Sequence, residues 1–130
     1  SRPVQPPNSP DMITIYGIKN CDTVKRARKA LEAADIAHRF HDFRSDGLAA
    51  ETVENWLKQL PAEQLLNRRG TTWRQLPADQ QARAEGDDLV ELLVEAPTLI
   101  KRPVIDRHGA LRVGFAAKDA DTILDWLRAG

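Results

Sequence analysis

Two kinds of apolar pattern alternate along the chain and predict alternating strands and helices. Residues 12–16, with the sequence MITIY, are rich in β-branched side chains and predict a strand. After a loop at 17–20, apolar residues recur every three or four positions, at Val24, Ala27, Leu31 and Ala34. Charged residues fill the positions between them, so we expect an amphipathic helix, with Asp22 or Thr23 capping its first turn.

The middle of the chain has mostly helical patterns. Residues 36–43 alternate and contain aromatics, but they are too polar for a central strand, so we expect an edge strand. A polar, basic loop is expected at 67–74. Helices are predicted around this loop, at 49–60, 62–66, 78–85 and 87–94.

The last third of the chain returns to strand patterns before a final helix. Two short strands are expected at 104–107 and 110–113, joined by a hairpin turn at His108-Gly109. Residues 117–127 predict the last helix, because Ile123, Leu124 and Leu127 fall on one face.

The order of these elements predicts an α/β fold of the thioredoxin type. The first β-α-β unit joins parallel strands, whereas the final hairpin is antiparallel. We therefore expect a four-stranded mixed sheet, in the order β-α-β … β-β-α, with an inserted helical subdomain at about 48–96.

The length of 130 residues fits one domain, which we place at 12–130. Residues 1–11 contain four prolines and no apolar stretch, so we expect a flexible arm or a remnant of cloning rather than a signal peptide. Lys+Arg and Asp+Glu both number 19, a balance that does not favour nucleic-acid binding. No apolar run approaches the roughly 18 residues of a membrane span, and the three histidines lack metal-ligand spacing.

The single cysteine, Cys21, lies where the first strand gives way to the first helix. Backbone N–H groups at a helix N-terminus favour negative charge, and the thiolate is the reactive form of cysteine. Lys19 adds a positive charge nearby. The alternative is a buried, inert cysteine, because free cysteines often act as small core residues. A lone cysteine forms no internal disulfide and fits the reducing cytoplasm.

Valine at position 24 restricts the chemistry open to Cys21. A dithiol oxidoreductase would carry a second cysteine at this position. Any disulfide that Cys21 makes is therefore mixed, to glutathione, to another protein or to a second copy.

Two further groups of residues are candidates for binding an anion. Arg102 precedes Pro103 at the start of a strand, so this peptide bond is a candidate cis bond, and the arginine offers a fork of donors. Arg68, Arg69 and Arg74 surround Trp73 and suggest an anion clamp with an aromatic wall. Surface charge, an ordinary proline and a core tryptophan are the simpler alternatives.

Four segments in this order resemble the arsenate reductase (ArsC)/Spx superfamily, and its YffB-type branch most of all. They are YGIKNCDTVKRARKALE, LLNRRGTTWR, IKRPVI and LRVGF, within a resemblance that runs from about Met12 to Leu127. The resemblance implies a thioredoxin-like fold with a helical insertion and a reactive cysteine after the first strand. In the reductases it also implies glutathione and glutaredoxin as the source of electrons.

By this resemblance the nucleophilic cysteine is Cys21, and the arginine of the family's R-P motif is Arg102. The resemblance also makes Pro103 the expected cis proline. From the charges and polar groups near the thiol, we expect Lys19, Asn20, Arg68, Arg69 and Pro103 to bind the substrate or glutathione. The arsenate-binding members carry two further arginines, at positions that hold Asn67 and, approximately, Gly114 here. Val24 replaces the second cysteine of the Spx redox switch.

The combined expectation is a cytoplasmic, glutathione-dependent thiol–disulfide reductase with one nucleophilic cysteine. Glutathione would be the co-substrate, with no metal or bound organic cofactor. The expected partners are glutathione and either glutaredoxin or a disulfide-containing protein, and neither nucleic acid nor a membrane is expected. The alternatives are a glutaredoxin-coupled arsenate reductase and a non-enzymatic, Spx-like regulatory binding protein.

Overall fold

The computed structural model describes residues 12–129, which fall into two compact units. Unit 1 contains the described residues up to Arg44 and those from Arg102 onward, and unit 2 is Ser45–Lys101. The arm expected at 1–11 lies outside the described residues. That 12–130 form one domain stays a prediction, as do the exact limits of the helical insertion.

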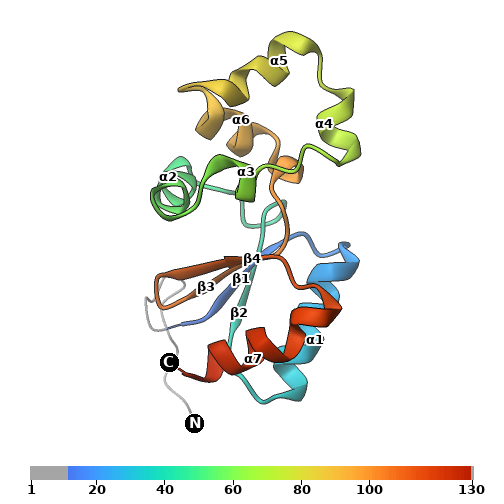
Figure 1. Cartoon of the computed structure of the whole chain (residues 1–130), viewed down its shortest axis with the longest axis vertical. Coiled ribbons are helices and arrows are strands. Elements are labelled where there is room, and N and C mark those ends of the chain that lie inside the picture. The colour runs from blue at the N-terminus through green and yellow to red at the C-terminus, as the bar shows by residue number, and fades with distance from the viewer. Residues whose placement is uncertain (1–11, 130) are drawn as a thin grey trace. The chain divides into compact units, whose positions relative to one another are not determined.

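Unit 1 contains a four-stranded mixed sheet (Figure 1). Its strands lie in the order β2-β1-β3-β4, where β1 is Thr14–Gly17, β2 is Arg39–Asp42, β3 is Val104–Arg107 and β4 is Ala110–Val113. Strand β1 pairs in parallel with β2 and antiparallel with β3, and β3 pairs antiparallel with β4. The mixed sheet and the edge position of the second strand are confirmed.

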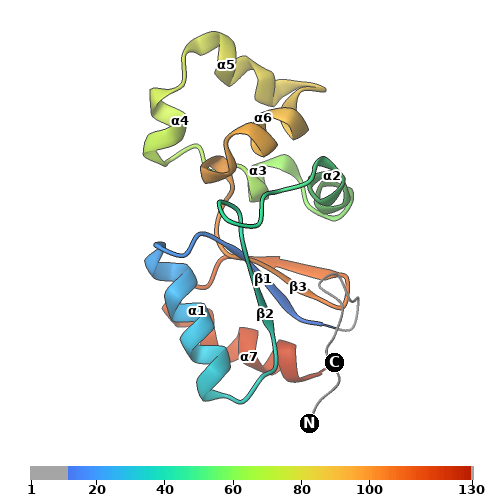
Figure 2. The same cartoon turned by 180° about the vertical axis from the view of Figure 1, so that it is seen from behind.

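Helices α1 (Asp22–Ala33) and α7 (Ala120–Ala129) cover one face of this sheet (Figures 1 and 2). A short 3₁₀ turn, Ala117–Asp119, leads into α7. Alternate residues of the central strands point at the two helices, as expected for a pleated strand. Together they form a buried apolar cluster of Ile13, Ile15, Ala27, Leu31, Ile105, Phe115, Ile123 and Leu127. Leu31 is fully buried here, and its burial stabilises the fold by about 1.5–3 kcal/mol.

Gly17 allows the end of β1 to approach the first turn of α1 closely. A Cβ atom on Gly17 would lie 2.6 Å from Cγ2 of Val24, a side chain with no exposed surface. No larger residue fits without moving the helix. Gly17 belongs to the strand, one residue beyond the predicted end, so the turn that follows is shorter than expected.

The regular elements of unit 2 are helical. They are α2 (Ala50–Gln59), α3 (Ala62–Leu65), α4 (Thr71–Gln75), α5 (Ala78–Ala82) and α6 (Leu89–Glu95), with 3₁₀ turns at Arg83–Glu85 and Pro97–Leu99. Helices α2 and α6 pack together and bury apolar side chains, among them Trp56 and Leu93.

The predicted loop at 67–74 is wrong in its second half, where α4 begins at Thr71. The sequence has no apolar repeat here, but one side-chain bond and one backbone bond hold the end of the helix. Gln81 Nε2 donates to the carbonyl oxygen of Trp73 at 2.9 Å, and the N–H of Leu76 donates to the same oxygen at 3.1 Å. These bonds satisfy a carbonyl at the end of a helix, a group that has no partner within the helix itself.

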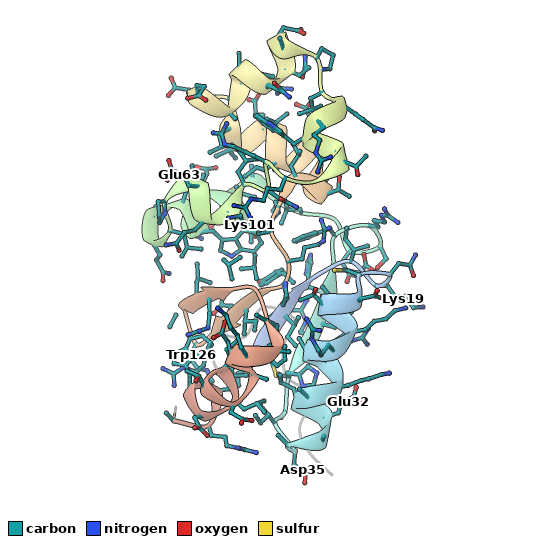
Figure 3. The ribbon with its side chains drawn as sticks, turned by 45° about the vertical axis from the view of Figure 1, so that its right-hand side comes forward. Lys19, Glu32, Asp35, Glu63, Lys101 and Trp126 are labelled. Carbon is teal, nitrogen blue, oxygen red and sulfur yellow. The ribbon has the colours of Figure 1, made fainter. Side chains whose placement is uncertain are left out.

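The C-terminal segment of unit 2 is bonded to α3 and the residues that follow it. The N–H of Asn67 donates to the carbonyl of Leu99 at 2.7 Å, and the N–H of Lys101 donates to that of Leu65 at 2.8 Å. Lys101 Nζ also donates to the carbonyl oxygen of Glu63 at 2.9 Å (Figure 3). The segment that leads to Arg102 is therefore fixed within unit 2 up to Lys101, the last residue of this unit.

Candidate active site

Cys21 occupies the N-cap position of α1. Its backbone is extended, with φ −84° and ψ 125°, and its carbonyl oxygen accepts the N–H of Lys25 at 2.9 Å as the first bond of the helix. Its own N–H donates to the carbonyl of Ile18 at 3.1 Å. The predicted cap by Asp22 or Thr23 is wrong, because both residues already lie inside the helix.

The position of the partly exposed Cys21 thiol favours its ionised form. Partial burial raises the pKa of this thiol, but stronger opposing effects bring the pKa below its usual value. These effects are hydrogen bonding to the backbone N–H groups of Val24 and Thr23 and to the side chain of Arg102, together with the positive charge of Arg102. The two N–H groups have no carbonyl partner inside the helix, so a thiolate is a natural acceptor for them.

Strand pairing brings Arg102 to the thiol. The chain enters β3 at Val104, which pairs with Tyr16, one residue before the end of β1. Arg102 is half-buried, and Pro103, which is buried, follows it through a cis peptide bond. The predicted cis bond is confirmed, whereas the catalytic role of Arg102 stays a prediction.

The turn before Cys21 carries the other two predicted residues of unit 1. Lys19 and Asn20 are exposed, and Lys19 lies at the N-terminal end of α1, while Glu32 and Asp35 lie toward the opposite end (Figure 3). This turn therefore places a cation and an amide on the solvent side of the thiol.

Arg68 and Arg69 belong to unit 2 and have contacts of their own there. The guanidinium of Arg68 lies over the ring of Trp73, 4.9 Å from its centroid, and 3.6 Å from a carboxylate oxygen of Glu85. The described contacts of Arg69 run through its backbone. Its N–H donates to Oδ1 of Asn67 at 3.1 Å, and its carbonyl accepts Nη2 of Arg74 at 2.7 Å. Their part in a site around Cys21 stays a prediction.

The sequence patterns did not indicate two residues that shape this site, Gly17 and Asp42. Gly17 sets the distance between β1 and α1, and Asp42 binds the turn before Cys21 through the N–H of Lys19. A signal for Asp42 exists in the sequence, because a carboxylate at the end of a strand that is parallel to β1 must lie near the end of β1. This signal can be recognised only once the strand order is known.

Within residues 12–129 no group of three or more histidine, cysteine, aspartate or glutamate side chains is arranged to hold a metal ion. None of the helices in this range has both the length and the apolar character needed to cross a membrane.

The mixed β2-β1-β3-β4 sheet agrees with comparisons to known proteins. The chain belongs to the ArsC family, whose model matches residues 16–123, and it has a thioredoxin-like fold. Among curated proteins, an uncharacterized protein of Haemophilus influenzae is 44% identical over 108 residues, which cover 83% of this chain and 95% of that protein. The global transcriptional regulator Spx of Listeria innocua is 26% identical over 106 residues and 80% of each chain.

Solved structures give the same result. An arsenate reductase (ArsC) related protein from Brucella melitensis is 45% identical, with a TM-score of 0.70, and the match covers 92% of this chain and 98% of that one. The YFFB protein is 36% identical, with a TM-score of 0.76, over 85% of this chain and 97% of that one. The chain is thus similar to arsenate reductase-like and Spx-like proteins.

Proposed function

We propose that the protein is a glutathione-dependent thiol–disulfide reductase that uses Cys21 as its only nucleophile. The observation that supports this most is the thiol at the N-cap of α1, whose pKa is lowered by backbone N–H groups and by Arg102 although burial raises it. Nucleophilic attack and departure of a thiol both require a sulfur that is stable as a thiolate.

The proposed reaction has two exchange steps, here written for a glutathionylated protein as the substrate class. The Cys21 thiolate attacks the glutathione sulfur, a Cys21–glutathione disulfide forms, and the protein thiolate leaves and takes up a proton. A glutathione thiolate then attacks the glutathione sulfur bound to Cys21, which releases oxidised glutathione and restores the Cys21 thiolate. In sum, one glutathione is oxidised for each mixed disulfide that is reduced.

Val24 supports a mechanism with an external thiol. It occupies the position of a second cysteine, is fully buried, and lies against Gly17. The mixed disulfide on Cys21 therefore has no neighbouring thiol in α1 to resolve it, and we assign this step to a second glutathione or to glutaredoxin. Both belong to the reducing cytoplasm, where we place the protein.

Glutathione carries two carboxylates, for which arginine is a suitable partner. We assign one carboxylate to Arg102, with Pro103 beside it; that Arg68 or Arg69 binds the other is a prediction from the sequence. Arg69 is the better candidate of the two, since Arg68 already contacts Glu85 and Trp73. Lys19 and Asn20 complete the proposed set by keeping the entrance to the thiol positive and polar.

Mass spectrometry of the intact protein after incubation with oxidised glutathione tests this function. We expect one glutathione per chain, located on Cys21 by peptide mapping, removed by reduced glutathione, and absent from Cys21→Ser. A wild-type protein that stays unmodified under these conditions would rule the proposal out.

Arsenate reduction is the second candidate, and the similarity to the Brucella melitensis protein favours it. Against it, two of the three arginines expected from the family fall in this chain on Asn67 and near Gly114. Gly114 has φ +91°, a conformation in which arginine would be strained. A coupled assay with arsenate, glutathione and glutaredoxin decides: turnover that depends on Cys21 would establish arsenate as a substrate.

A further inference from the structure

Asp42 is a buried carboxylate at the end of the edge strand β2. Only 9% of its surface is exposed. In the parallel pairing of β1 with β2, Asp42 lies opposite Gly17, the residue from which the chain turns toward Cys21. An ionised carboxylate in such a place needs hydrogen-bond donors, because burial without them is strongly unfavourable.

The donors come from two different segments. Oδ1 of Asp42 accepts the N–H of Arg44 at 2.8 Å, a local turn of the kind that aspartate often forms two residues ahead of itself. Oδ2 accepts the N–H of Lys19 at 3.3 Å, across 23 positions of sequence. One carboxylate thus joins the end of β2 to the turn that precedes the nucleophile.

Other bonds fix the same turn at its two ends. The N–H of Phe43 donates to the carbonyl of Gly17 at 2.9 Å, and the N–H of Cys21 donates to the carbonyl of Ile18 at 3.1 Å. Lys19 lies between these points, and the bond to Asp42 is the described bond that holds its N–H. If this bond is lost, the backbone from Lys19 to Cys21 can shift away from the first turn of α1.

We propose that Asp42 is a positioning residue for Cys21, because its carboxylate holds the Lys19 N–H and so keeps the thiol at the N-cap of α1 beside Arg102. The inference rests on the proposed function for its consequence in catalysis. The effect of Asp42 on the position of the thiol is measured without glutathione.

The direction in which the pKa of the Cys21 thiol moves distinguishes a positioning role of Asp42 from a purely electrostatic one. Loss of a negative charge near a thiol stabilises the thiolate and lowers the thiol pKa. Loss of the bond to Lys19 moves the sulfur away from the N–H groups of Thr23 and Val24 and from Arg102. Because these groups lower the pKa of the thiol, their loss raises that pKa. Asp42→Asn combines both changes, because the amide keeps one acceptor for Arg44 but presents N–H₂ to Lys19.

The test follows the rate of alkylation of Cys21 by iodoacetamide against pH in wild type, Asp42→Asn and Asp22→Asn. Asp22 is the matched control, since it is an exposed carboxylate next to Cys21 in the first turn of α1. For Asp42→Asn we expect the alkylation profile to move to higher pH and the rate near neutral pH to fall about three- to tenfold. For Asp22→Asn we expect an unchanged profile or a shift to lower pH.

A folded Asp42→Asn protein with an unchanged profile, or one moved to lower pH, would overturn the inference. Hydrogen exchange of the wild-type Lys19 amide gives a second test that does not depend on the variant's folding. We expect this amide to be protected, whereas exchange at the rate of an unstructured amide overturns the inference. If alkylation behaves as expected but no glutathione adduct forms, the positioning role stands and the proposed function fails.

Discussion

The first turn of α1 in unit 1 and the arginine segment of unit 2 both present basic residues, but they use them differently. In unit 1, pairing of β3 with β1 brings half-buried Arg102 to one sulfur atom, and its interaction lowers the pKa of that thiol. In unit 2, Arg68 contacts Glu85 through side chains that are 44% and 72% exposed. Such exposed ion pairs contribute about 0–1 kcal/mol.

A high density of arginines is a weaker indication of a chemical role than their tertiary placement. Three arginines within seven residues of unit 2 suggest an anion clamp, yet Arg68 and Arg74 have local partners. One arginine in unit 1, on a segment 81 positions beyond Cys21 (102 − 21), contacts the Cys21 sulfur. Substitutions in the two regions should therefore have different consequences.

The largest effect is expected for Cys21→Ser. Serine is a preferred N-cap residue, so the helix should keep its stability, whereas adduct formation and reductase activity should fall to background. Thermal unfolding and the glutathione assay measure the two properties separately. Residual activity that is sensitive to thiol reagents in this variant would point to a different nucleophile.

Arg102→Ala should have the next largest effect. Without the guanidinium, the thiol pKa rises and a donor for the substrate is lost, so we expect a roughly 10- to 100-fold lower rate near neutral pH. The acid limb of the rate profile should move to higher pH, because more alkaline conditions are needed to form the thiolate. Lys101→Ala is the matched control, since Lys101 is exposed and donates to Glu63; it should behave like wild type.

Gly17→Ala should destabilise unit 1 by about 1–3 kcal/mol, because the new methyl group would overlap Val24. The first turn of α1 must move to make room, which should also raise the pKa of Cys21. Gly86→Ala is the control: nothing lies within 4 Å of its Cβ position, and its φ of −145° suits any residue. Denaturant unfolding of both variants gives the comparison, and equal stabilities would contradict the role given to Gly17.

The smallest effects are expected in unit 2, from Arg69→Ala and Arg68→Ala. If Arg69 holds a carboxylate of glutathione, its loss should raise the KM for glutathione about three- to tenfold and leave the thiol pKa unchanged. Arg68→Ala should change KM less, because this side chain contacts Glu85 and Trp73. The reverse order would assign the carboxylate to Arg68, and no change in either variant would remove this segment from the site.

Local patterns in the sequence were enough to predict most of unit 1. The strands at Val104–Arg107 and Ala110–Val113 have the predicted bounds, because His108-Gly109 forms a tight hairpin turn between them. The position of Cys21 between β1 and α1 was also predictable, since a β-branched run and a helical repeat meet there.

The features that were not predictable depend on contacts that the local sequence pattern does not reveal. The role of Asp42 depends on its hydrogen bond from the N–H of Lys19. Helix α4 is held by a bond from Gln81, which lies outside that helix. Cys21 as the N-cap residue was missed because neighbouring Asp22 and Thr23 are more usual caps. In each case the local sequence permits several outcomes, and the tertiary fold selects one of them.

Titration of the Cys21 thiol tests whether the N-terminus of α1 and Arg102 together stabilise a thiolate. Thiolate absorbance against pH, in wild type and Arg102→Ala, gives both pKa values without substrate. We expect the wild-type pKa to lie below the usual value of about 8.5 and the pKa of Arg102→Ala to be higher than that of wild type. A wild-type thiol that titrates at or above the usual value, with no change in Arg102→Ala, would show that neither the helix N-terminus nor Arg102 stabilises the thiolate.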